Sequence, residues 1–384
     1  MFDFDKIVDR RESNSYKWDI ADGELPMWVA DMDFETAPAI KKALQTRVNH
    51  GIFGYNIVPD SWKNAYVKWW KERHRFEINP DWLIFSTGVV PTMSSVVRKV
   101  TTPGENVLML TPVYNIFYNS ILNNGRHVLE SPLRYEDGRY AIDFEDLEEK
   151  MADPQTSLLL FCNPQNPTGN IWSKEELKCV GDLCKKYSVI ALVDEIHCDL
   201  TDPGFSYVPY ASVSEECRQN SIVCMAPTKA FNIAGLQTSA VMVADDVLRH
   251  RVNRGLNTDE VAEPNSFAIE ASNAAWNEGG QWLDALRRYL MENKEYVKNY
   301  LKEHIPEIKV VSSHATYLMW LDCSAITDDT KQLCEDIRKQ TGLYMSYGKQ
   351  YGGNGNYFIR LNIACPRKLV EDGMNRLYQA RRGK

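Results

Sequence analysis

A single lysine, Lys229, lies in an otherwise uncharged stretch of thirteen residues, 225–237, which begins at the end of the apolar run 221–225. Apolar neighbours disfavour the ammonium form of an amine, so we expect the pKa of Lys229 to be lowered. An amine of this kind suits Schiff-base chemistry. A solvated surface lysine is the alternative, but it fits poorly with a segment that carries only one charge.

An acidic pair and a histidine follow a second apolar run. Residues 191–193 are Ala-Leu-Val, and Asp194, Glu195 and His197 come next. A carboxylate at the carboxyl end of a parallel strand faces the ligand crevice, where it would pair with a cationic ring nitrogen. Taken alone, the pattern is equally consistent with Asp194 as a helix cap and His197 as a surface residue.

A seven-residue loop, 163–169, has the sequence Asn-Pro-Gln-Asn-Pro-Thr-Gly and follows the apolar run 157–161. Two Asn-Pro steps and a glycine predict an irregular turn at the end of a strand. An ordinary connecting turn rarely needs two rigid Asn-Pro units. We therefore expect this loop to hold an Asn side chain toward the crevice.

These segments must be positioned by the elements around them. Five short apolar runs alternate with segments of helical periodicity, as expected for parallel strands that are covered on both faces. Between them, Ser173 and Glu176 have the spacing of a capping box at the start of a helix over 173–187. The alternation predicts an α/β fold with a mostly parallel central sheet flanked by helices. The predicted strands are 106–110, 157–161, 189–193, 221–225 and 239–243.

The C-terminal part follows a different pattern. Apolar residues recur at the helical period through 280–304, and two further strands are predicted near 316–321 and 357–363. This pattern predicts a smaller α+β domain, with the domain boundary within the long helix.

Composition excludes several classes of protein. The chain has 384 residues, 44% hydrophobic and 25% charged, with a formal net charge of -8. These values are typical of a folded globular protein, and the acidic balance argues against a nucleic-acid partner. No window is apolar enough to predict a membrane span or a signal peptide. The nine cysteines include no C-x-x-C pair, which predicts reduced thiols, no metal site and a cytoplasmic protein.

The three segments together, N-P-x-N-P-T-G, D-E-x-H and P-T-K-A-F-N, resemble fold-type I pyridoxal 5'-phosphate (PLP) enzymes of the class I/II aminotransferase superfamily. The resemblance covers essentially the whole chain and implies PLP as the cofactor. It implies that Lys229 forms a Schiff base with PLP and moves the substrate α-proton. Asp194 would keep the pyridine nitrogen protonated, and Asn166 would bond the ring O3′ oxygen. His197 stands where many relatives have a Tyr, so its role in binding the cofactor stays open.

The resemblance also implies contacts to the rest of the cofactor. The backbone amides of Val89 and Val90, at the start of a predicted helix, would bind the phosphate. Thr228 would donate its hydroxyl there. Tyr114 would stack on the ring face as a further catalytic residue. Many relatives carry an Arg eight residues after the lysine, where this chain has Gln237.

Three more residues are implied to act on the substrate or across subunits. Tyr55 resembles the Tyr that reaches the phosphate of the neighbouring subunit, which implies a homodimer. Arg360 would clamp the substrate α-carboxylate, with Asn166 and Ala30 beside it. A core aromatic is the alternative for Tyr55 and for Tyr114, and a salt-bridged structural arginine is the alternative for Arg360.

Four segments indicate a subgroup within this superfamily. Residues 25–34, 194–200, 229–237 and 359–366 are similar to MalY/PatB-type cystathionine β-lyases, also called cysteine-S-conjugate β-lyases. This similarity implies a carbon–sulfur lyase of methionine and cysteine metabolism that converts L-cystathionine and related conjugates to thiol, pyruvate and ammonia by α,β-elimination. An L-amino acid aminotransferase is the alternative, because it uses the same residues. A regulator with a fused DNA-binding domain is not expected, since the family segment begins within the first residues.

The same resemblance implies two domains. Residues 41–282 would form the large PLP-binding domain, and residues 1–40 together with 283–384 a discontinuous small domain. Residues 347–353 include three glycines and are equally consistent with a flexible lid and with a surface loop.

Overall fold

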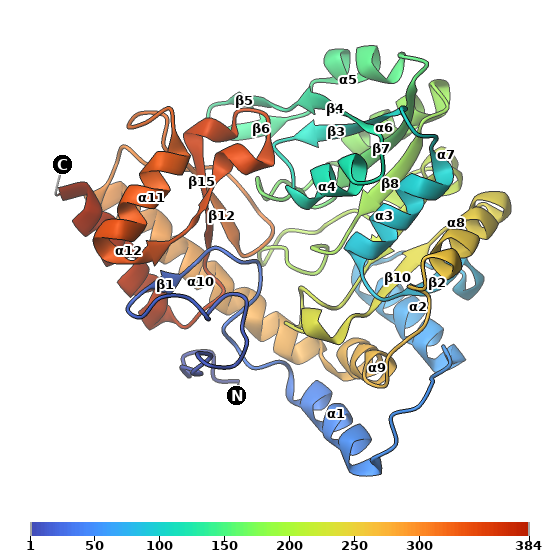
Figure 1. Ribbon diagram of the computed structural model, residues 1–384, viewed down its shortest axis with the longest axis horizontal. Coiled ribbons are helices and arrows are strands. Elements are labelled where there is room, and N and C mark those ends of the chain that lie inside the picture. The colour runs from blue at the N-terminus through green and yellow to red at the C-terminus, as the bar shows by residue number, and fades with distance from the viewer. Residues whose placement is uncertain (1, 383–384) are drawn as a thin grey trace.

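The computed structural model describes residues 2–382. Its largest sheet has seven strands, with helices such as α3 (Val89–Val100) and α5 (Phe144–Met151) beside it (Figure 1). The strand order is β2-β10-β9-β8-β7-β3-β4. Strands β3, β4, β7, β8 and β9 run parallel, which confirms the predicted α/β fold. The bounds are β2 (Leu83–Ser86), β3 (Asn106–Thr111), β4 (His127–Pro132), β7 (Thr156–Cys162), β8 (Ile190–Asp194), β9 (Ser221–Met225) and β10 (Ser239–Met242).

Strand β10 departs from the expectation that all five apolar runs form parallel strands. It is antiparallel to both of its neighbours, β9 and β2. Residues 226–238 join β9 to β10 through turns and the short 3-10 helix η3 (Ala234–Leu236). A parallel crossover needs a dozen or more residues that usually form an α-helix. The strand predicted at 239–243 is therefore present but antiparallel, while the sheet as a whole is mostly parallel, as predicted.

Side chains of the central strands alternate between two layers of helices. Met109 and Leu160 pack on the face that is covered by α3 (Val89–Val100), α4 (Ile116–Leu122) and α8 (Asp246–Thr258). Leu108 and Leu159 pack on the opposite face, which α5 (Phe144–Met151) and α6 (Lys174–Lys186) cover. Because both faces are buried, the strands are apolar along their whole length.

A second sheet, antiparallel and four-stranded, has the order β11-β12-β15-β14. The helix predicted at 280–304 is present as α10 (Gly280–His304). Strand β1 (Leu25–Pro26) pairs with β13 (Leu343–Tyr344), so the blue N-terminal segment lies beside the red C-terminal part in Figure 1. This pairing supports a discontinuous small domain, whose exact boundaries stay a prediction. The strands of the second sheet are β11 (Lys309–Val310), β12 (Leu318–Asp322), β14 (Ser346–Tyr347) and β15 (Phe358–Asn362).

The remaining elements lie around these two sheets. None of the helices within residues 2–382 has the length and apolar character that crossing a membrane requires. The other helices and the small hairpin are α1 (Pro38–His50), α2 (Asp60–His74), α7 (Glu215–Gln219), α9 (Ala268–Glu278), α11 (Thr330–Thr341), α12 (Arg367–Arg382), β5 (Arg134–Glu136) and β6 (Arg139–Ala141).

Residues 347–353 are closely packed against the rest of the chain. Tyr351, within the 3-10 helix η4 (Gly348–Tyr351), is buried. A Cβ added to Gly348 would lie 2.3 Å from the carbonyl oxygen of Gly355. The glycine at this position permits a close approach of two backbone segments. Gly348 and Tyr351 anchor the segment in the protein, while Lys349 and Gly353 are exposed at its surface.

Candidate active site

A cavity of about 250 Å³ lies at the carboxyl edge of the large sheet. The pairing register aligns Cys162, Asp194 and Cys224 at or near the ends of β7, β8 and β9, so the loops after these strands reach the same edge. The cavity walls include nine of the eleven site residues predicted from the sequence, namely Ala30, Val89, Val90, Tyr114, Asn166, Asp194, His197, Thr228 and Lys229.

Lys229 stands in a turn that follows β9. Backbone hydrogen bonds from Phe231 to Pro227 (2.9 Å) and from Ile233 to Thr228 (3.0 Å) close this turn. The Lys229 Nζ donates a hydrogen bond to the Ala30 carbonyl oxygen at 2.6 Å.

The electrostatic surroundings of Lys229 favour its neutral form. Burial, followed by repulsion from Arg360, lowers the pKa of Lys229 to about 8, while Asp31 and Asp194 act in the opposite direction. The shift agrees with the expectation from the uncharged sequence around the lysine. Lys229 therefore has a larger neutral fraction near neutral pH than an ordinary lysine.

Asp194 ends strand β8 with a buried carboxylate that accepts the backbone N–H of Ile196 at 3.0 Å. Burial raises the pKa of Asp194 to about 6, because loss of water disfavours the charged form more than this bond favours it. The segment after Asp194 forms turns and not a helix, so a helix cap is not its role. A cationic ring nitrogen beside this carboxylate would compensate for its burial.

His197 is buried, which removes the alternative of a surface residue. Burial, followed by the positive charges of Lys229 and Arg360, lowers the pKa of His197 to about 3. The ring is therefore neutral near neutral pH. Within residues 2–382 its Nδ1 atom has no hydrogen-bond partner. A buried, unpaired ring nitrogen beside the cavity is available to a polar atom of a ligand.

Arg360, on β15, is buried and reaches the site from the second sheet. Its guanidinium donates to Asn166 Oδ1 at 3.3 Å and to the Trp28 carbonyl at 2.9 Å. Its side chain also lies over the Tyr351 ring, 4.8 Å from the ring centre. The described part of the chain gives Arg360 no carboxylate partner within 4.0 Å, which argues against a structural salt bridge. Its charge remains available to a carboxylate ligand.

The opposite end of the cavity is the N-terminus of α3. Val89 and Val90 form the first turn of this helix, and Thr228 and Gln237 line the same cavity. The first backbone N–H groups of a helix have no partner within the helix, and they favour an anion such as phosphate. Gln237 occupies the position of the missing arginine as an exposed, uncharged side chain.

The structure places the two predicted tyrosines differently. Tyr114 lines the cavity, and burial raises the pKa of its phenol. Tyr55 is fully exposed and lies outside the cavity of its own chain. Tyr55 is therefore not a core aromatic, which was its alternative, whereas Tyr114 lines the cavity and also packs against the hydrophobic cluster that contains Phe117.

Two contacts at the site have no signal in the sequence. Tyr317 donates its hydroxyl hydrogen to the Ala30 carbonyl at 3.0 Å. Asp31 lies close enough to Lys229 to influence the pKa of the amine. Tyr317 stands within a predicted apolar strand and Asp31 within a segment noted only for its resemblance. No spacing or charge pattern marks either residue.

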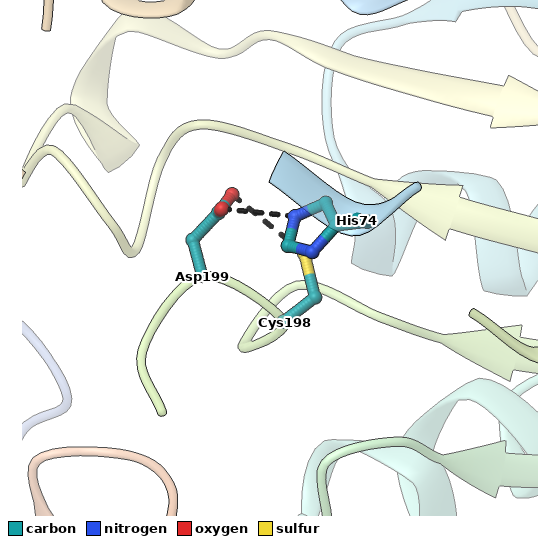
Figure 2. A group of neighbouring side chains, drawn as sticks. All are labelled: His74, Cys198 and Asp199. Carbon is teal, nitrogen blue, oxygen red and sulfur yellow. Dashed lines mark hydrogen bonds and ion pairs between the residues drawn. The ribbon is translucent and has the colours of Figure 1, made fainter. Parts of the chain in front are cut away.

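A second polar group is formed by Cys198 and Asp199, which directly follow His197 in the chain, together with His74 (Figure 2). Its potential ligand atoms lie within 4.8 Å of one another, a grouping that no pattern in the sequence predicts. The buried Asp199 carboxylate already accepts the indole N–H of Trp69 at 3.0 Å and contacts His74 Nε2 at 3.0 Å. Both partners belong to α2, so this group ties the loop that carries His197 to that helix.

Comparisons with known proteins agree with this geometry. The chain matches the aminotransferase class I and II family over residues 25–377. It is 41% identical to the cystathionine beta-lyase PatB of Bacillus subtilis, over 98% of this chain and 99% of that protein. It is 34% identical to protein MalY of Escherichia coli, over 99% of both.

A solved structure gives the same result for the fold. Cystalysin from Treponema denticola, whose crystal structure contains a pyridoxal 5'-phosphate cofactor, has a TM-score of 0.97 with this chain. The two are 32% identical, and the match covers 100% of this chain and 99% of that one. The chain therefore belongs to the aminotransferase class I and II family.

Proposed function

We propose that this protein is a PLP-dependent carbon–sulfur β-lyase that cleaves L-cystathionine and related cysteine S-conjugates by α,β-elimination. The proposal is carried by one observation. Lys229, an amine of lowered pKa, and Asp194, a buried carboxylate, line the same cavity. The similarity to PatB and MalY over nearly the full length of each protein favours the lyase reaction. With cystathionine and water, the products would be homocysteine, pyruvate and ammonia.

The residues of the cavity fit PLP. Asp194 would keep a proton on the ring nitrogen, and the pair would relieve the cost of burying the carboxylate. The amides of Val89 and Val90 and the hydroxyl of Thr228 would hold the phosphate. Asn166 and the unpaired nitrogen of His197 would bond the O3′ side of the ring. When bound, PLP supplies an electron-accepting ring that stabilises negative charge at the substrate Cα.

The chain's own residues would then orient the substrate and move its proton. Arg360 would hold the substrate carboxylate, because its guanidinium is buried without a carboxylate partner among the described residues. Lys229, as a free amine, would take the α-proton at Nζ. A pKa of about 8 makes this amine a competent base near neutral pH. Departure of the thiolate from Cβ would follow from the negative charge at Cα.

An aminotransferase would use the same residues, so the two functions must be separated by their products. Purified protein with PLP is incubated with cystathionine, cysteine, cystine and S-alkyl cysteines, and no keto acid is added. The lyase is expected to release pyruvate together with an equal amount of the sulfur product, which is a thiol from cystathionine and S-alkyl cysteines, hydrogen sulfide from cysteine and a persulfide from cystine. An aminotransferase would instead need a keto acid and would keep the β-substituent. A protein that stays colourless on addition of PLP would contradict both functions.

We also propose a homodimer in which Tyr55 serves the neighbouring site. Residues Ile52, Phe53, Tyr55 and Ile57 expose 66%, 54%, 102% and 80% of their surfaces. Contiguous exposed apolar side chains mark interaction surfaces in folded proteins. Tyr55 lies outside the cavity of its own chain, which is consistent with a role in a partner subunit.

A further inference from the structure

The backbone segment from Trp28 to Phe34, here called the strap, lies against Lys229. The Ala30 carbonyl accepts the hydrogen bond from Lys229 Nζ at 2.6 Å. Neighbouring carbonyls are held as well, by Asn362 Nδ2 at Asp31 (2.7 Å) and by Asn232 Nδ2 at Met32 (2.9 Å). The position of the Lys229 amine is therefore linked to the position of this strap.

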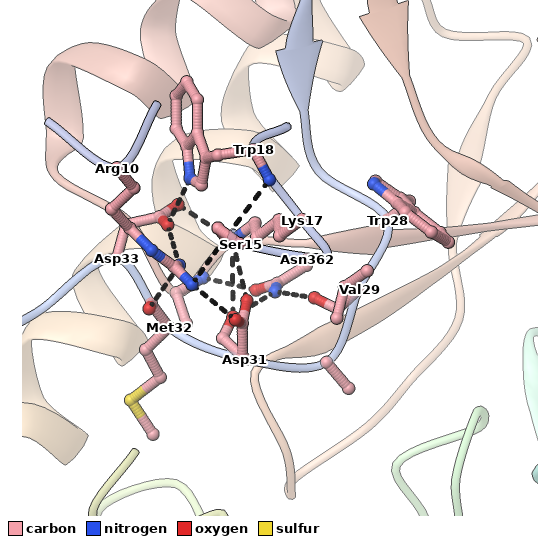
Figure 3. A network of polar contacts seen from close by, with 12 residues as sticks. Arg10, Ser15, Lys17, Trp18, Trp28, Val29, Asp31, Met32, Asp33 and Asn362 are labelled. Atoms are coloured by element: carbon pink, nitrogen blue, oxygen red, sulfur yellow. Dashed lines mark hydrogen bonds and ion pairs between the residues drawn. The ribbon is translucent and has the colours of Figure 1, made fainter. Parts of the chain in front are cut away.

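An ion cluster fixes the outer side of the strap (Figure 3). Arg10 bridges two carboxylates, with 2.7 Å to Asp31 Oδ2 and 2.6 Å to Asp33 Oδ1. Lys17, which is 1% exposed, lies 2.8 Å from Asp33 Oδ2 and 3.6 Å from Asp31 Oδ1. Trp18 also donates its indole N–H to Asp33 at 2.7 Å. The cluster contains two cations and two anions, so its formal charges cancel.

The balance of charge at the cluster extends to Lys229. Asp31 raises the pKa of the amine, and Asp194 acts in the same direction. Arg360 acts in the opposite direction. Three uncharged side chains complete the surroundings, since the pKa of His197 is lowered and the pKa values of the Tyr114 and Tyr317 phenols are raised. Arg10 pairs with Asp31 and offsets its charge, although Arg10 is not among the residues that line the cavity.

We propose that Arg10 is a positioning residue for Lys229, which acts through the Asp31 carboxylate and the Ala30 carbonyl of the strap. The Arg10–Asp31 pair sets both where the amine rests and how much negative charge faces it. The proposal rests on the proposed function only in taking Lys229 as the reactive amine. It predicts that the two members of the pair have opposite effects on Lys229, because Asp31 without Arg10 keeps only the more distant Lys17 as a counter-charge, and Arg10 without Asp31 pairs only with Asp33.

The test measures the protonation of Lys229 directly. The full-length apoprotein is treated with an amine-reactive acylating reagent across a pH series, and modification of Lys229 is quantified by mass spectrometry. We expect R10Q to move the midpoint of labelling up by about one pH unit and D31N to move it down by a similar amount. The double variant R10Q/D31N should return toward the wild-type midpoint. R10K, which keeps the charge, should also stay near wild type.

K6Q provides a matched control, because Lys6 pairs with Glu35 in the same N-terminal region at 3.0 Å but both side chains are largely exposed. It should leave the midpoint unchanged. A purely structural role would move R10Q and D31N in the same direction, and that result would overturn the proposal, as would unchanged midpoints. If R10Q does not fold, the comparison of R10Q/D31N with D31N decides, since a double-variant midpoint no higher than that of D31N contradicts the role of Arg10.

The holoenzyme gives a second readout that separates this inference from the proposed function. The pH midpoint of its visible absorbance should shift with the same signs in the two single variants. If the wild-type protein binds no PLP, the proposed function fails while the labelling midpoints still test the role of Arg10. If wild type binds PLP and releases pyruvate but the variants do not shift in opposite directions, the positioning role alone is wrong.

Discussion

At the scale of single residues, the site combines titratable side chains whose charged forms are disfavoured by burial. Lys229 and His197 are shifted toward their neutral forms, and Asp194 has a raised pKa. Each shift arises because the cavity replaces water with protein groups that stabilise the charge less well. A ligand with a cationic ring nitrogen and an anionic end would compensate for several of these costs together. The pKa values of the residues predicted from the sequence are thus set by the groups that surround them in the cavity.

Lys229→Ala should lower pyruvate release from cystathionine by about 10³-fold or more, because both the amine that holds PLP and the base at Cα are lost. Steady-state assay with saturating PLP measures this effect. Lys302→Ala, which removes an exposed lysine on α10, should keep wild-type activity. A Lys229→Ala variant with the wild-type rate would refute the proposed mechanism.

Asp194 should make the apoprotein less stable as pH rises from about 4 to 6. Its pKa is about 6 in the folded state and 3.8 when unperturbed, so the native state binds more protons than the unfolded state in this window. Asp194→Asn removes the buried charge. The free energy of unfolding of the variant, relative to that of wild type, should be about 2–3 kcal/mol higher at pH 7 than at pH 4, as measured by urea unfolding. The same difference in unfolding free energy between variant and wild type at pH 4 and at pH 7 would contradict this expectation. Added PLP should reverse the variant's gain in stability.

At the scale of elements, the site is assembled by the loops after β7, β8 and β9 together with the start of α3. The strands were predicted within one or two residues because apolar runs covered on both faces are a strong local signal. The antiparallel direction of β10 was not predicted from the sequence. It arises because no crossover helix forms between residues 225 and 239. The capping box predicted from Ser173 and Glu176 is present at the start of α6, because it depends only on residues close together in the sequence.

Ser173→Ala should destabilise the protein by about 1 kcal/mol, because Ser173 Oγ accepts the Glu176 backbone N–H at 3.1 Å. Urea unfolding at equilibrium measures the loss. Ser173→Asp keeps an acceptor at the cap and should remain close to wild type. An equal loss in both variants would show that the cap bond is not the cause.

At the scale of the whole molecule, two segments far apart in the sequence complete the site. The strap comes from the N-terminal region, and Arg360 comes from the second sheet and bonds the Trp28 carbonyl at 2.9 Å. The second sheet and the N-terminal segment therefore meet at the cavity. The exposed segment that includes Tyr55 suggests that one more contribution comes from a second copy of the chain.

Mixing two variants, one with weakened PLP binding and one inactive, tests that contribution. Tyr55→Ala should weaken PLP binding, and Lys229→Ala should be inactive, but a hybrid dimer would contain one site with both native residues. Statistical mixing of subunits should restore activity to about a quarter of wild type. Light scattering reports the dimer in the same samples. A mixture without recovered activity, in which hybrid dimers are shown to form, would contradict the role of Tyr55.

The sequence by itself predicted the candidate site residues and the class of fold, and the fold class is confirmed. Lys229, Asp194 and Asn166 are marked by local features, namely a lone charge, an acidic strand end and a loop with two Asn-Pro steps. These signals are readable because they depend on neighbours within a few residues. The resemblance to a known family then supplied the other eight of the eleven predicted site residues, and nine of the eleven line the cavity.

Only the tertiary structure decided which groups act on these residues from a distance. Arg10 meets Asp31 across 21 positions in the sequence, and Lys229 meets Ala30 across 199. His74 meets Asp199 across 125. Such contacts leave no periodicity or spacing in the chain, because they depend on how the whole fold brings distant segments together. The pKa shifts at the site have the same origin, since burial and charge are properties of the assembled cavity.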